Sequence, residues 1–150
     1  MAQPEKIIAY RIVQVAIDDF KMQPQQLNDK DELGINTSYI FQANFDIQCV
    51  RCLSSFVFTK GDARLIELKL SCVFAIEPSM FESMYDESKQ HFTIDAYFCR
   101  YMATIAVGAA RGVIAAKTEN SPLAEVVLPP INLVEAIKND SVFTVTQRVQ

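Results

Sequence analysis

Four cysteines are the residues of this chain whose type and spacing most readily suggest chemistry. Cys49 and Cys52 have the C-x-x-C spacing of metal and redox sites, and Cys72 and Cys99 follow at longer intervals. A structural zinc site needs a second close pair or nearby histidines, whereas His91 is the only histidine. Residues three apart on a strand also point to opposite faces. We therefore expect reduced, buried thiols that pack as small apolar side chains, with no metal and no cofactor.

Motifs of nucleophilic catalysis and phosphate binding do not occur in the sequence. The G-x-S-x-G, Walker A, G-x-G-x-x-G and H-E-x-x-H patterns are all absent. The adjacent carboxylates of Asp18 and Asp19 fit a solvated turn better than a general acid–base pair. No nucleophile or metal ligand lies near His91 at a sequence spacing typical of a catalytic or metal-binding motif. We therefore expect a protein that is not an enzyme.

Length and charge limit the possible partners. The chain has 150 residues, the size of a single domain spanning 1–150, and a formal net charge of -4 without any basic run. Such a protein has no electrostatic reason to bind nucleic acid or an anionic membrane. The first residues do not resemble a signal peptide, and the near-apolar run from Tyr101 to Ala116 is short for a membrane span. We expect a cytoplasmic protein.

The first half of the sequence has the pattern of β-strands. Residues 7–20 and a region from about Ile35 onward alternate between apolar and polar side chains, which predicts a sheet with one packed face. The second region holds two strands, whose break falls either at 46–48 or at Ser54-Ser55. Lys60-Gly61-Asp62 predicts a hairpin turn, and 63–77 is the clearest strand, ended by Pro78.

The second half is predicted to be helical. A long helix over 93–117, with Thr93 as a possible N-cap, has small side chains and apolar positions at helical spacing. It ends at 118–122, and a short helix follows over 132–139. Residues 141–149 form either a short strand or a tail. The fold class is therefore α+β, a four-stranded antiparallel meander with a long helix and a short second helix on one face.

Two segments resemble the SecB family of protein-export chaperones. Residues 98–114, Phe-Cys-Arg-Tyr-Met-Ala-Thr-Ile-Ala-Val-Gly-Ala-Ala-Arg-Gly-Val-Ile, are similar to the long helix of that family. Residues 128–133, Leu-Pro-Pro-Ile-Asn-Leu, are similar to its Leu-x-Pro-(Ile/Val)-Asn-Phe signature, with Leu133 in place of Phe. Tyr10-Arg-Ile12, Leu65-Ile-Glu67 and 73–76 resemble family strands, so the resemblance spans about residues 7–139.

The resemblance implies a SecB-like, ATP-independent chaperone. Family members are homotetramers, built as dimers of dimers, that bind non-native polypeptides in apolar grooves and pass them to the secretion motor ATPase. One alternative is a partner-specific adaptor or a toxin–antitoxin-associated chaperone on the same scaffold. A small-molecule-binding domain is a further, weaker alternative. By resemblance, Leu65 and Glu67, on the solvent side of the last strand, match a pair that contacts the motor; the alternative is an ordinary solvated strand face.

Aromatic and aliphatic side chains supply candidate contact residues, because they bury much area and adapt to varied partners. The alternative is that most of them simply fill the core. The candidates for peptide binding are Phe56, Phe58, Phe81, Met84, Tyr85, Ile131 and Leu133. Small residues on the long helix predict a subunit interface, the alternative being tight packing on its own sheet. These interface residues are Ala103, Gly108, Ala109, Gly112 and Ala116.

Overall fold

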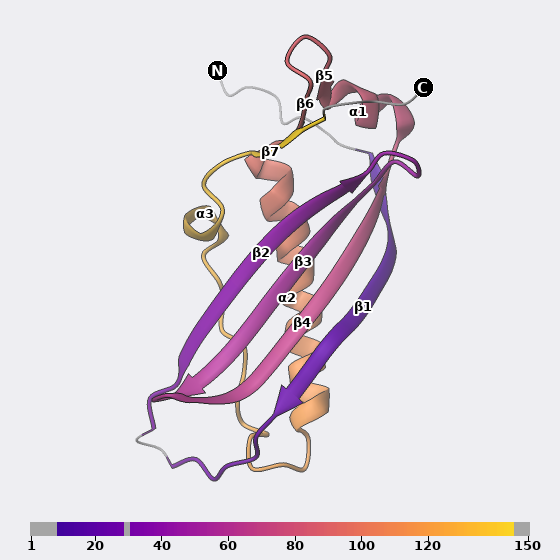
Figure 1. The fold of residues 1–150 in the computed structure, drawn as a ribbon. Coiled ribbons are helices and arrows are strands. Elements are labelled where there is room, and N and C mark those ends of the chain that lie inside the picture. Colours follow the sequence, from indigo (N-terminus) through magenta and orange to yellow (C-terminus); the bar gives the residue numbers. More distant parts are fainter. Residues whose placement is uncertain (1–8, 29–30, 146–150) are drawn as a thin grey trace, which may run out of the picture.

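A four-stranded antiparallel sheet forms from the first half of the chain (Figure 1). The structure is a computed structural model that describes residues 9–28 and 31–145. Its strands are β1 (Tyr10–Met22), β2 (Gly34–Asn44), β3 (Cys49–Lys60) and β4 (Ala63–Ile76), paired in the order β1-β4-β3-β2. The turn between β2 and β3 falls at residues 45–48, which confirms the first of the two predicted positions for this break.

The alternation of side chains decides which face of the sheet is covered. Even-numbered residues of β3 and β4, such as Phe56 and Leu68, are buried under the long helix α2 (Ala96–Thr118). Figure 1 shows α2 behind the sheet and no helix in front of it. The predicted α+β class, a four-stranded antiparallel sheet with the long helix on one face, is confirmed. The predicted simple meander is wrong in one respect, because β1 crosses over to pair with β4 and does not pair with β2.

Helix α2 begins three residues later than predicted. Asp95 is its N-cap, and the carboxylate accepts a hydrogen bond from the backbone N–H of Phe98 at 2.8 Å. Thr93 instead lies in a strand. By length and composition alone, α2 could also cross a membrane, although a long core helix passes the same test and α2 packs over β3 and β4.

A second, small sheet closes one end of the molecule, and the sequence analysis missed it. The segment between the strand predicted over 63–77 and the predicted long helix contains α1 (Pro78–Ser83), β5 (Tyr85–Asp86) and β6 (His91–Ile94). Strand β6 also pairs with β7 (Ser141–Thr144). These elements lie together at the top of Figure 1. The terminal segment is therefore a strand over 141–144; the rest of the predicted 141–149 includes 146–149, outside the described residues.

Two arginines of α2 hold the returning chain against this helix. The Arg111 guanidinium donates to the carbonyl oxygens of Leu128, at 2.8 Å, and Pro129, at 3.0 Å. Arg100 Nε donates to the carbonyl oxygen of Ile137 at 2.8 Å. Between these anchors the second helix, α3 (Leu133–Ala136), has one turn only and is shorter than predicted.

Candidate functional site

The lower groove is an open depression of mixed polar and apolar lining between two loops at the end of the sheet opposite the small sheet. One wall is the β1–β2 connection and the other is the chain that follows α2; Figure 1 shows both at the bottom of the molecule. Its volume is about 740 Å³. Its apolar and proline lining consists of Leu27, Leu33, Ile35, Phe58, Pro122, Ala124, Val126, Val127 and Pro129, and its polar lining consists of Gln26, Asn28, Asp31, Ser121 and Glu125.

Alternation within the second wall produces its exposed apolar side chains. Leu123, Val126 and Leu128 point into the core and are buried. Val127 between them is 67% exposed, an unusual position for a valine. Because buried neighbours on both sides fix the backbone, Val127 is held in place at the rim of the groove and is available for contact.

A polar clamp orders the first wall. The Asp31 carboxylate accepts a hydrogen bond from the backbone N–H of Asn28 at 2.8 Å and lies 3.2 Å from Lys60 Nζ. These two partners, the Asn28 N–H first, hold the pKa of Asp31 below its ordinary value. The clamp ties the β1–β2 connection to the end of β3, so the wall containing Leu27 and Leu33 has a defined position.

The predicted peptide-binding residues do not form one groove. Phe58 lines the lower groove, although the side chain is almost fully buried. Phe56 is fully buried between β2 and α2 and makes an edge-to-face contact with Tyr39 at 6.1 Å between ring centroids. The expectation that Phe56 is open to a client is wrong, because β3 continues to Lys60 and its even-numbered residues face α2.

Three further predicted residues lie at the opposite end of the molecule. Phe81 and Met84 are buried, and the Phe81 ring lies 4.7 Å from that of Phe92 and 5.7 Å from that of Phe45, centroid to centroid. The small sheet closes over them, so they belong to a local core and not to an open groove. Tyr85 is half-buried in β5.

The last two predicted residues lie along the returning chain. Ile131 and Leu133 are half-buried and pack against the main core. They flank Asn132, whose side-chain oxygen caps α3 by accepting from the backbone N–H of Glu135 at 3.3 Å. Part of each side chain remains accessible, near but not within the lower groove.

The predicted interface residues of α2 divide into two groups. Ala103 is fully buried against the sheet, so its predicted place at a subunit surface is wrong. Gly108, Gly112 and Ala116 are exposed, and Ala109 is half-buried. A Cβ atom added at Gly108 or Gly112 would meet no atom within 4 Å. Tight packing of these glycines on their own sheet, the alternative reading of the sequence, is therefore wrong.

The edge strand β1 presents uncovered aliphatic side chains beside these glycines. Ile12, Val15 and Ile17 pair with Phe74, Cys72 and Leu70, and therefore share the helix side of the sheet. Each nevertheless remains 46–50% exposed, because α2 packs over β3 and β4. We call Ile12, Val15 and Ile17 with the exposed side of α2 (Tyr101, Gly108 and Gly112) the uncovered flank.

Contacts at both ends show that β1 and α2 run side by side along the uncovered flank. Near the start of β1, Tyr10 donates its hydroxyl proton to Tyr101 Oη at 2.6 Å. Near its end, Lys117 Nζ lies 6.0 Å from the centre of the Phe20 ring. The exposed aliphatic side chains of β1 therefore lie on a strand that contacts α2 near both of its ends, and exposed apolar side chains grouped in this way are of the kind that marks an interaction site.

The pair expected to contact a secretion motor is not freely presented. Leu65 is fully buried, so its predicted solvent-side position is wrong. The register shifts between Phe58–Ile66 and Thr59–Arg64, which leaves Leu65 as an extra, bulged residue whose side chain turns inward. Glu67 does face outward, but it forms an ion pair of 2.8 Å with Arg64. Motor binding through this pair stays a prediction from the resemblance alone.

The four cysteines are free and buried, as expected. Burial, followed by the nearby Cys72 and Cys99, raises the pKa of the Cys52 thiol to about 12, which makes it a poor nucleophile. Within residues 9–28 and 31–145, no three His, Cys, Asp or Glu side chains are grouped as a metal site would require. Asp18 and Asp19 lie within β1 and not in a turn.

Sequence reasoning missed most of the lower groove. Leu27 and Leu33 lie in the polar segment between the first two predicted strands, and Val127 lies between the two predicted helices, so none of the three belongs to a predicted element. Isolated leucines in a polar loop are a usable signal, because a loop with no packing role does not need them. Their meeting with the chain after α2 depends on tertiary structure.

Comparison with known proteins supports a SecB-like fold. No protein-family model and no curated protein matches the chain. Among solved structures, the chain is similar to the SecB-like chaperone Rv1957 of Mycobacterium tuberculosis, solved in complex with a ChAD peptide from the HigA1 antitoxin. The TM-score is 0.51 at 9% sequence identity, over 82% of this chain and 91% of the neighbour.

A second solved structure, a protein of unknown function from Streptococcus agalactiae, matches with a TM-score of 0.39 and 10% identity, over 83% of this chain and 99% of the other. Only the first of the two TM-scores exceeds 0.5, so the SecB-like neighbour alone supports a shared fold. At such identities the likeness concerns the fold and not the partners.

Proposed function

We propose that the protein is an ATP-independent chaperone that holds non-native polypeptides, with an apolar client segment in the lower groove. The observation that supports this most directly is the groove itself, an open depression of about 740 Å³ on a SecB-like fold, in which apolar side chains such as Leu27, Leu33 and Val127 lie among polar ones. Burial of client side chains there contributes roughly 25 cal/mol per Å² of apolar surface. No nucleotide is needed for such binding.

The free edge of β2 offers a second source of affinity beside the groove. β2 is the last strand of the sheet and pairs only with β3 among the described strands. Its first residues, Gly34 and Ile35, adjoin the groove. An extended client leaving the groove can add backbone hydrogen bonds to this edge, which are independent of client sequence. Broad selectivity follows, as a holding chaperone requires.

The uncovered flank supports an oligomer, and we propose the homotetramer implied by the resemblance. A monomer that exposed this surface would be prone to aggregation. Association through the flank would bury Ile12, Val15 and Ile17 while leaving the lower groove, which is lined by the loops beyond β1 and α2, open to clients.

The test is client binding by a groove variant with a matched control. Val127→Glu places a charge at the groove rim and, since Val127 is exposed, leaves the fold intact. We expect affinity for a reduced, unfolded client, measured by fluorescence anisotropy, to fall about tenfold. Val142→Glu introduces the same charge at an exposed valine of β7 and should bind as the wild type does. Equal binding by all three proteins would refute a client site at the groove.

A partner-specific adaptor is the second candidate, favoured by one observation. The SecB-like neighbour is bound to a peptide from an antitoxin. An adaptor would bind one partner tightly and generic unfolded chains weakly. Titration with several unrelated unfolded proteins separates the two: similar micromolar affinities support the general chaperone, and failure to bind any of them supports the adaptor.

A further inference from the structure

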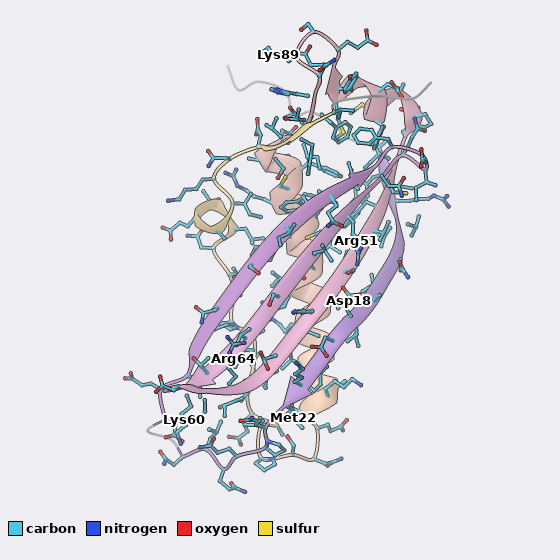
Figure 2. All side chains as sticks on the ribbon, in the orientation of Figure 1. Asp18, Met22, Arg51, Lys60, Arg64 and Lys89 are labelled. Atoms are coloured by element: carbon cyan, nitrogen blue, oxygen red, sulfur yellow. The ribbon has the colours of Figure 1, made fainter. Side chains whose placement is uncertain are left out.

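We draw no further inference here: the strongest candidate, the hollow of about 990 Å³ between β3 and the β5–β6 hairpin, is lined by Arg51 (Figure 2) together with the carboxylates of Asp46, Glu82 and Glu87, and nothing in the structure shows what covers it.

Discussion

Arg111 is the residue that connects the long helix to the groove. Its two hydrogen bonds, to the carbonyl oxygens of Leu128 and Pro129, fix the wall that presents Val127. A planar guanidinium can reach both carbonyls at once, whereas an ammonium group can reach one at best. Arg111, which lies within the segment that resembles the SecB family, therefore has a physical role in shaping the site.

Replacement of Arg111 by methionine should loosen this wall. We expect the free energy of unfolding to fall by about 2 kcal/mol, because two carbonyls lose a charged donor, and client affinity to fall with it. Arg111→Lys should be intermediate. Urea denaturation and client anisotropy measure the two effects, with Lys138→Met as a surface control. Unchanged affinity in a destabilised Arg111→Met protein would show that the wall does not set the binding site.

The Asp31 clamp makes a prediction about acid pH. The pKa of Asp31 is lower in the folded protein than its ordinary value of 3.8. The Asp31 carboxylate therefore stabilises the fold at pH values above 3.8, and this stabilisation is lost as the pH falls through the lowered pKa. Stability should therefore decline below about pH 4, and Asp31→Asn should show a shallower decline. Urea midpoints between about pH 7 and pH 3 measure this.

Asp62→Asn is the matched control for the clamp, since Asp62 is exposed in the β3–β4 turn and has no hydrogen bond or ion pair among the described residues. Its pH dependence should follow the wild type. The lowered pKa values of Glu77 and Asp86 have the same sign, so part of the acid sensitivity should remain in Asp31→Asn. An unchanged slope would show that the clamp does not contribute.

At the scale of elements, alternation predicted the large sheet well. The strand predicted over 63–77 is observed as β4 over 63–76. Its bounds were predictable because alternate burial of side chains appears in the sequence as alternating apolar and polar residues. The bulge that buries Leu65 was missed, although the consecutive apolar residues Leu65 and Ile66 interrupt the alternation at that point. The small sheet was missed because β5 has two residues and β6 pairs with β7 from the far end of the chain.

The candidate site was predicted less well than the fold. Large apolar side chains were selected by type, and the structure buries three of them, Phe56, Phe81 and Met84. Type alone does not distinguish a core ring from a groove ring, because both positions favour the same side chains. The exposed glycines of α2 were found from sequence because glycine within a helix costs stability and so indicates a packing reason.

These glycines allow a test of α2 as an interface element. Nothing within the subunit lies within 4 Å of a Cβ atom at Gly108 or Gly112. In an isolated subunit, each change to alanine should therefore stabilise the helix by up to about 1 kcal/mol. In the proposed oligomer the methyl groups would separate the packed helices, and Gly108→Ala/Gly112→Ala should dissociate at higher concentration than the wild type.

Light scattering coupled to size exclusion, run over a dilution series, measures that dissociation. Thermal melting measures the stability of the subunit. A double variant that melts higher with an unchanged mass at every concentration would show that the glycines face solvent and not a second helix. A lower melting temperature with an unchanged mass would instead require a contact within the subunit, contrary to the open space beside both glycines.

For the whole molecule, the proposed chaperone has two surfaces with separate tasks. The lower groove takes the client, and the uncovered flank joins subunits. They lie on different parts of one sheet, which separates them physically. The flank is the surface on which the proposed homotetramer depends, since it contains the exposed aliphatic edge of β1.

Val15→Glu should therefore dissociate the oligomer into folded monomers. Val15 is 50% exposed in the subunit, so the charge is solvated when the subunit is free but is buried against a partner copy, at a cost of several kcal/mol. Ile40→Glu is the matched control, because Ile40 is 58% exposed on the opposite face of the same sheet. Light scattering should give a monomer mass for the first variant and the wild-type mass for the second. A wild-type mass in both, or a monomeric wild type, would remove the flank as the subunit interface and with it the proposed tetramer.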